Sequence, residues 1–382
     1  MKKIIIIFLL LMCIPYNVQA LDKQASDDSD NKQIQQLYDY IYNMKTECEI
    51  LKDMNIRDYV KNYMKKKEGG FPVKKFFNAV LSYFFKETAA SMKLMAVIII
   101  LSIICSLLGN LEKAFSNETL SNMAYFACFG VIIIFMTKSF YSGVDIAKTT
   151  INSMTNFMTA LIPVLMTLLA SIGGFTEAAF MDPVIIGTIN VVSGLYVNFI
   201  IPLIFMTFAM QFVSSISKDY KIDKLIKLIN QIALWAQGIL MTIFIGVITV
   251  RSMASKTIDQ VTAKAAKYAV DNFVPIVGKC LSDAIGTVAG YSVLLKNAVS
   301  SVGLIVILII VIFPAVKVLI MAFMYKLVAA LIEPISDTRL VSCINSAGDS
   351  MILILSCLIS VSVMFFVMIS IVAAAGKMAV GG

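Results

Sequence analysis

Lys317 stands near the middle of the apolar run Val302–Ala330, three residues after Pro314. A charge at this depth is costly if it faces lipid, so we expect Lys317 to face protein or water. Snorkelling of its ammonium to the membrane surface is the alternative. Proline removes a helical hydrogen bond and kinks the helix axis. We expect this effect at Pro314 and at Pro202, which lies in another long apolar run. Pro202, Pro314 and Lys317 are therefore the candidates for a polar path or a kink.

The sequence lacks the patterns that usually carry catalysis or hold a metal. It has no histidine, and its seven cysteines form no CxxC pair, which disfavours a zinc site. The phosphate-binding pattern GxxxxGK[ST], the zinc-protease pattern HExxH, the hydrolase pattern GxSxG and a calcium loop do not occur. We therefore predict a protein that is not an enzyme, with no catalytic, cofactor-binding or metal-binding residues and no cofactor.

A second pattern lies between two apolar runs, where small residues recur every fourth position at Gly278, Ser282, Gly286 and Gly290. On a helix this spacing forms a ridge of small residues, which lets another backbone approach closely. Pro275 suits the first turn of such a helix. Residues 254–300 are thus predicted to be either an amphipathic segment on the membrane surface or a re-entrant, pore-lining segment.

Composition places the chain in a membrane. Of its 382 residues, 59% are hydrophobic and the mean hydropathy is +0.85, well above the range of soluble domains. The net charge of +8 fits contact with anionic membrane lipids. No surface with interleaved basic and aromatic residues suggests nucleic acid as a partner.

The first part of the chain is predicted to be exported. Residues 1–20 form a signal peptide, with Lys2 and Lys3 before an apolar stretch and a small-residue cleavage site ending at Ala20. An uncleaved anchor is the alternative. Residues 21–91 are predicted to be an exported helical region that ends in an interfacial helix, Val73–Ser91, with phenylalanines on one side and lysines that reach head groups.

Residues 92–382 are predicted to form a multi-span membrane domain. Each of its long apolar segments is near or above the roughly 20 residues that a span requires. The fold class expected is all-α, a polytopic helical membrane protein with about seven transmembrane helices. The seven segments are Leu94–Asn110, Met123–Tyr141, Phe157–Gly174, Val184–Phe212, Asn230–Val250, Val302–Ile332 and Met351–Ala375.

Charge alone gives conflicting sides for the loops. An exported N-terminus with seven spans places Arg251–Ser301 and the C-terminus in the cytoplasm, where the lysines of that segment obey the positive-inside rule. The lysines of the preceding loop, Lys218 to Lys227, then break the rule. If the long fourth segment crosses twice, Lys218 to Lys227 obey the rule and the lysines of Arg251–Ser301 break it.

Several motifs carry a resemblance to a known family. Asn272–Gly278, Ser282–Ala284, Leu294–Val299, Phe313–Lys317 and Ala329–Asp337 resemble the stage III sporulation protein AE family, as does the order of parts along the chain. The resemblance implies a multi-pass protein of the mother-cell membrane around the forespore (the outer forespore membrane) during engulfment. It implies as partners the other stage III AA–AH proteins, including the AA secretion-type ATPase, and indirectly the forespore protein Q. The family supplies no catalytic residues.

Three functions follow as hypotheses. The stage III AA–AH proteins are expected to form a channel complex that late forespore gene expression needs. The first hypothesis is that this chain is a permease-like membrane subunit of that complex and forms part of its translocation path. The second is a stand-alone secondary transporter, which usually requires a convergent set of ionisable groups at membrane depth. The third is a membrane scaffold without a pore.

Overall fold

The computed structural model describes residues 73–114, 118–172, 175–216, 222–273 and 277–375. These residues are helical almost throughout and contain no strand, which agrees with the predicted all-α class. The signal peptide and residues 21–72 lie outside the described residues, so those predictions stay predictions. The helices are α5 (Val73–Ala114), α6 (Glu118–Ala170), α7 (Phe175–Leu195), the π-helix η1 (Tyr196–Ile200), α8 (Ile201–Ile216), α9 (Asp223–Phe273), α10 (Val277–Ile332) and α11 (Thr338–Ala374).

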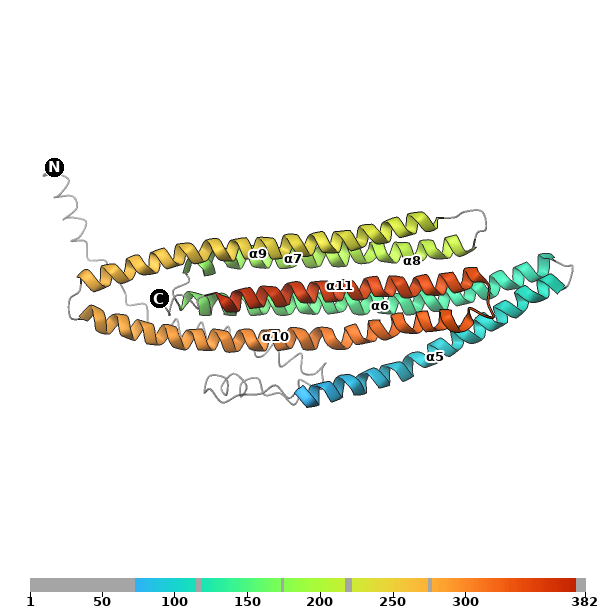
Figure 1. The fold of residues 1–382 in the computed structure, drawn as a ribbon, viewed down its shortest axis with the longest axis horizontal. Coiled ribbons are helices and arrows are strands. Elements are labelled where there is room, and N and C mark those ends of the chain that lie inside the picture. Colours follow the sequence, from blue (N-terminus) through green and yellow to red (C-terminus); the bar gives the residue numbers. More distant parts are fainter. Residues whose placement is uncertain (1–72, 115–117, 173–174, 217–221, 274–276, 376–382) are drawn as a thin grey trace.

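The helices lie lengthwise beside one another in an elongated bundle (Figure 1). In this bundle α9 runs along α7 and α8, whereas α6, α10 and α11 all contact one another. The helices α7, η1 and α8 form one continuous run, and the other consecutive helices are joined by short connections and run in opposite directions. The first described helix, α5, runs parallel to α10 and packs on both α6 and α10. The helices α5, α6 and α10 therefore contact one another.

Six helical segments are long and apolar enough to cross a membrane, counted over the described part of the chain. Several helices are much longer than a bilayer needs. With 56 residues, α10 is about 84 Å long, whereas the hydrocarbon core is about 30 Å thick. Parts of these helices must therefore extend outside the hydrocarbon region.

The described residues do not confirm the predicted count of seven spans, because two predicted spans belong to one helix. Met123–Tyr141 and Phe157–Gly174 both fall largely within the 53-residue helix α6. The stretch between them contains Asp145 and Lys148, which lowers its hydropathy and suggested a loop. On α6, however, Gly143, Ala147 and Ile151 are buried at four-residue spacing. This buried stripe keeps the polar stretch helical.

Two other predicted segments are also arranged differently. The predicted interfacial helix is the first half of α5 and continues into the apolar run without a break. Residues 254–300 do not form one segment. They are divided between the end of α9 and the beginning of α10, which are separated only by residues 274–276.

The two prolines singled out from the sequence, Pro202 and Pro314, lie in different backbone surroundings. Pro202 follows the five-residue π-helix η1. Proline has no backbone N–H to donate, and the wider turn of the π-helix lies directly before this position. The fourth predicted segment is thus one helical run from Pro183 to Ser215 with an internal bulge. Pro314 lies within α10, which remains a continuous helix.

Candidate functional site: an ionic groove between α5, α6 and α10

A cavity of about 380 Å³ lies between α5, α6 and α10. Its charged lining comes from one residue of each helix, namely Glu87, Lys138 and Lys317. Hydroxyl groups of Ser91, Ser139, Ser142 and Tyr325 also line it, and the remaining wall is apolar and rich in methionine: Ala90, Met95, Ile98, Phe135, Met321, Met324 and Val328. We call this cavity the ionic groove.

Glu87 and Lys317 form an ion pair, with 3.2 Å between the carboxylate Oε1 and the ammonium Nζ. The Lys317 side chain is 35% exposed and that of Glu87 is 18% exposed, so the pair is half-buried. One turn earlier on both helices, the rings of Tyr83 and Phe313 meet edge to face with centroids 5.1 Å apart. Residues four apart share a helix face, so these two contacts fix the register of α5 on α10.

Lys138 supplies the second cation of the groove. Its side chain is exposed, and none of the ion pairs found among the described residues includes it. The next turn of α6 places Ser142 on the same side of the groove. Because Glu87 is engaged by Lys317, the groove has an excess of positive charge at Lys138.

The floor of the groove is held by a buried tyrosine of α10. Tyr325 is 3% exposed, and its hydroxyl donates a hydrogen bond to the carbonyl of Met136 on α6 at 3.2 Å. This bond fixes α10 against α6 at the depth of Lys138. Close approach of helices near this level involves Gly143, where an added Cβ would lie 2.6 Å from the methyl group of Met351.

A second ion pair lies on the far side of α10. The Lys326 ammonium is 2.6 Å from Oδ1 of Asp349 on α11, and the two side chains are 38% and 52% exposed. This pair joins α10 to α11. Beside it, an added Cβ on Gly348 would lie 2.9 Å from the Lys326 stem and 3.3 Å from the Ala322 carbonyl oxygen.

A fully buried lysine lies at the far end of α11. The Lys296 ammonium donates to the carbonyl of Ala375, just after the last residue of that helix. A cation at a helix C-terminus is favourable because it compensates the helix dipole and the unpaired carbonyl groups. Lys296 therefore ties the beginning of the apolar part of α10 to the end of α11.

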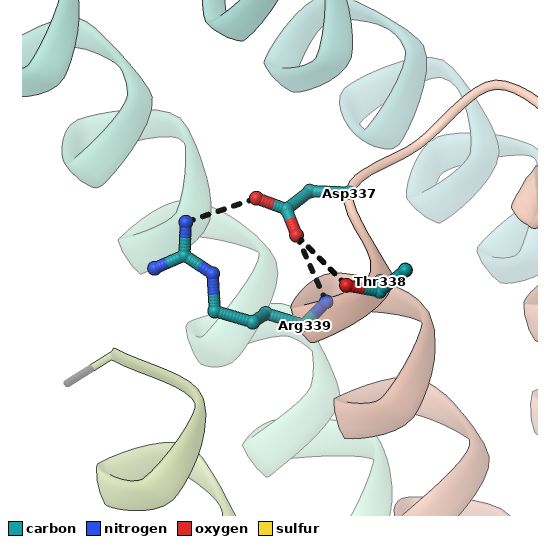
Figure 2. A network of polar contacts seen from close by, with 3 residues as sticks. All are labelled: Asp337, Thr338 and Arg339. Carbon is teal, nitrogen blue, oxygen red and sulfur yellow. Dashed lines mark hydrogen bonds and ion pairs between the residues drawn. The ribbon is translucent and has the colours of Figure 1, made fainter. Parts of the chain in front are cut away.

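The turn between α10 and α11 is closed by a three-residue polar network (Figure 2). The Asp337 carboxylate accepts a hydrogen bond from the Arg339 backbone N–H at 3.0 Å and caps the beginning of α11. Its other oxygen pairs with the Arg339 guanidinium at 3.0 Å. Burial raises the pKa of Asp337, but the hydrogen bonds from Arg339 and its positive charge outweigh burial and leave the pKa below the ordinary 3.8.

The residues predicted from sequence are distributed unevenly over this site. Lys317 lines the ionic groove, with Pro314 one turn before it, whereas Pro202 belongs to the α7–α8 layer. Of the predicted small-residue ridge, Gly278, Ser282 and Gly286 have side-chain positions outside the described residues. An added Cβ on Gly290 would have open space around it. A packing partner for the ridge thus stays a prediction.

Sequence reasoning missed Glu87 and Lys138. Glu87 follows Lys86 in the stretch predicted to lie at the lipid head groups. At that position a carboxylate is expected to face water, so the sequence does not indicate an ion pair with Lys317. Lys138 was assigned to the end of a span. For the close approach at Gly143 a signal does exist, because Ser139, Gly143 and Ala147 repeat small residues at the spacing that favours helix packing.

The described residues hold no group of three or more acidic or cysteine side chains that could bind a metal. Cys105, Cys128, Cys343 and Cys357 form no disulfide within the described part of the chain. The predicted lack of a cofactor is not tested by these observations.

Comparisons with known proteins give a consistent result. The family described as stage III sporulation protein AE matches residues 54–376. A protein of Bacillus subtilis (strain 168) named "Stage III sporulation protein AE" is 38% identical over 308 residues, which cover 81% of this chain and 77% of that protein. No solved structure matches. The chain therefore belongs to the stage III sporulation protein AE family.

Proposed function

We propose that this chain is a non-enzymatic membrane subunit of the channel complex that joins mother cell and forespore and is needed for late forespore gene expression. Family membership supports the sporulation role. The proposed partners are the other stage III AA–AH proteins, including the AA secretion-type ATPase, and through them the forespore protein Q. The proposed location is the mother-cell membrane that surrounds the forespore.

The observation that carries the channel role is the half-buried Glu87–Lys317 pair in the ionic groove. Ionisable groups in otherwise apolar helices are costly and usually serve a function. Here the pair joins a helix that packs at the side of the bundle to the central helix α10. Movement of α5 relative to α10 would separate the two charges that line the groove, so the pair is suited to line or gate a polar path.

Six crossings also suggest new sides for the loops. With an exported N-terminus, an even number of spans returns the C-terminus and the α9–α10 connection to the exported side. Lys218, Lys221, Lys224 and Lys227 then lie in the cytoplasm, as the positive-inside rule favours. This arrangement reverses the sides expected from seven spans.

A stand-alone secondary transporter is the second candidate. It is favoured by the convergence of Glu87, Lys138 and Lys317 on one cavity, because transporters usually gather ionisable groups at their binding site. Uptake by the purified chain alone in liposomes would support the transporter. Stable isolation with the AA–AH companions, together with no uptake, would support the channel subunit.

The test of the channel role is Lys317→Met, which keeps the stem length and removes the ammonium. With the variant brought to wild-type abundance, we expect normal association with the companion proteins but loss of late forespore gene expression. Lys326→Met is the matched control, because Lys326 lies on the same helix and pairs with an exposed acid. Equal, near-wild-type sporulation of both variants would remove Lys317 from the path. Loss of companion binding in Lys317→Met alone would instead indicate a scaffold role.

A further inference from the structure

We propose that the ionic groove binds the phosphate of an anionic phospholipid, with the lipid's acyl chains lying along the apolar wall of the groove. The first argument is charge. Glu87 is engaged by Lys317, whereas Lys138 is exposed and forms none of the ion pairs found in the described residues. Ser142 lies one turn away and adds a hydroxyl donor. A phosphate oxygen suits this combination of ammonium and hydroxyl donors.

The second argument is the shape and polarity of the cavity. Beside Lys138 the groove is walled by Phe135, Ile98 and Met95, and Phe135 is 38% exposed. Ile98 is already buried, but a free inorganic anion would leave the exposed part of Phe135 uncovered. An anion with a hydrocarbon body would cover the wall and also neutralise the lysine, so the ligand class is an amphiphile.

The third argument is depth. The hydrogen bond from Tyr325 to Met136 places Lys138 at about the level of Lys326, which pairs with Asp349. After Asp349, α11 carries no charged residue from Ser350 to Ala374, a length of roughly 37 Å that is sufficient for the hydrocarbon core. On α11 the level of Lys138 is therefore the beginning of a charge-free stretch of bilayer length.

The test measures lipid binding to the purified full-length chain in neutral detergent by native mass spectrometry, with phosphatidylglycerol against phosphatidylcholine. We expect preference for phosphatidylglycerol, reduced about tenfold in Lys138→Gln and largely retained in Lys138→Arg. The control is Lys224→Gln, which removes an exposed lysine of α9, away from the groove, and should leave the preference for phosphatidylglycerol unchanged. Glu87→Gln should act in the opposite direction and strengthen binding several-fold, because it frees Lys317 for the phosphate.

Ser142→Phe fills the exposed mouth of the groove without touching a charge, and it should weaken binding of both lipids near Lys138. Millimolar inorganic phosphate separates the two sources of the anion. If phosphate displaces phosphatidylglycerol completely, the site recognises a free anion and the lipid assignment is wrong. Equal preference for phosphatidylglycerol in wild type, Lys138→Gln and Ser142→Phe would also overturn it. Companion proteins are absent from this assay, so its outcome is independent of the channel role.

Discussion

The Glu87–Lys317 pair should be strongly coupled, and a double-mutant cycle measures that coupling. The three variants are Glu87→Gln, Lys317→Met and the combination. At 3.2 Å the Coulomb attraction is roughly 5 kcal/mol for an effective dielectric constant of about 20, before desolvation is subtracted. Exposed pairs contribute a net 0.2–1 kcal/mol or so, and breaking a buried pair costs about 3–5 kcal/mol.

The exposed fractions decide where this pair falls between those limits. Glu87 is the more buried partner at 18%, so Lys317→Met leaves a poorly solvated carboxylate and should destabilise the protein by about 2 kcal/mol. Glu87→Gln leaves the more exposed ammonium and should cost only about 1 kcal/mol. The double variant removes both charges and should be close to the milder single variant. The resulting coupling is about 1–2 kcal/mol.

The assay is unfolding of the detergent-solubilised protein in a titration with a denaturing detergent, followed by circular dichroism. Lys326→Met serves as the reference for a more exposed pair and should cost less than about 1 kcal/mol. Additive single effects, with no coupling, would mean that the two side chains do not meet. The register of α5 on α10 that the Glu87–Lys317 contact defines would then be wrong.

Three further predictions concern packing, capping and topology. Gly303→Leu should destabilise the protein by more than about 2 kcal/mol in the same titration, because an added Cβ would lie 2.6 Å from Leu161, whereas Gly290→Leu, which has open space, should be neutral. Asp337→Ala should cost about 1 kcal/mol through loss of the α11 cap. Because the folded pKa of Asp337 is lowered, its contribution is present above the ordinary 3.8 and lost as pH falls below it, so the variant and wild type should converge in acid. A reporter fused after Ala266 should be exported if the chain crosses six times, and cytoplasmic activity there would contradict that count.

The sequence by itself determined the helical class, the apolar character and the family. These follow from local properties: hydropathy along the chain, the small number of charges, and motifs such as Phe313–Lys317. It also singled out Lys317 as a charge near the middle of an apolar run. Local composition suffices for these conclusions because each depends on a residue and its neighbours in the chain.

Only the tertiary structure decided the number of helical runs and the partners of the charges. Asp145 and Lys148 lower the hydropathy of their stretch, yet the opposite face of α6 packs into the bundle at Gly143 and Ala147. Hydropathy averages over both faces of a helix and so cannot distinguish such a stretch from a loop. Glu87 and Lys317 are likewise joined only by the packing of α5 on α10, because nothing in the local sequence of either helix specifies the register of the other.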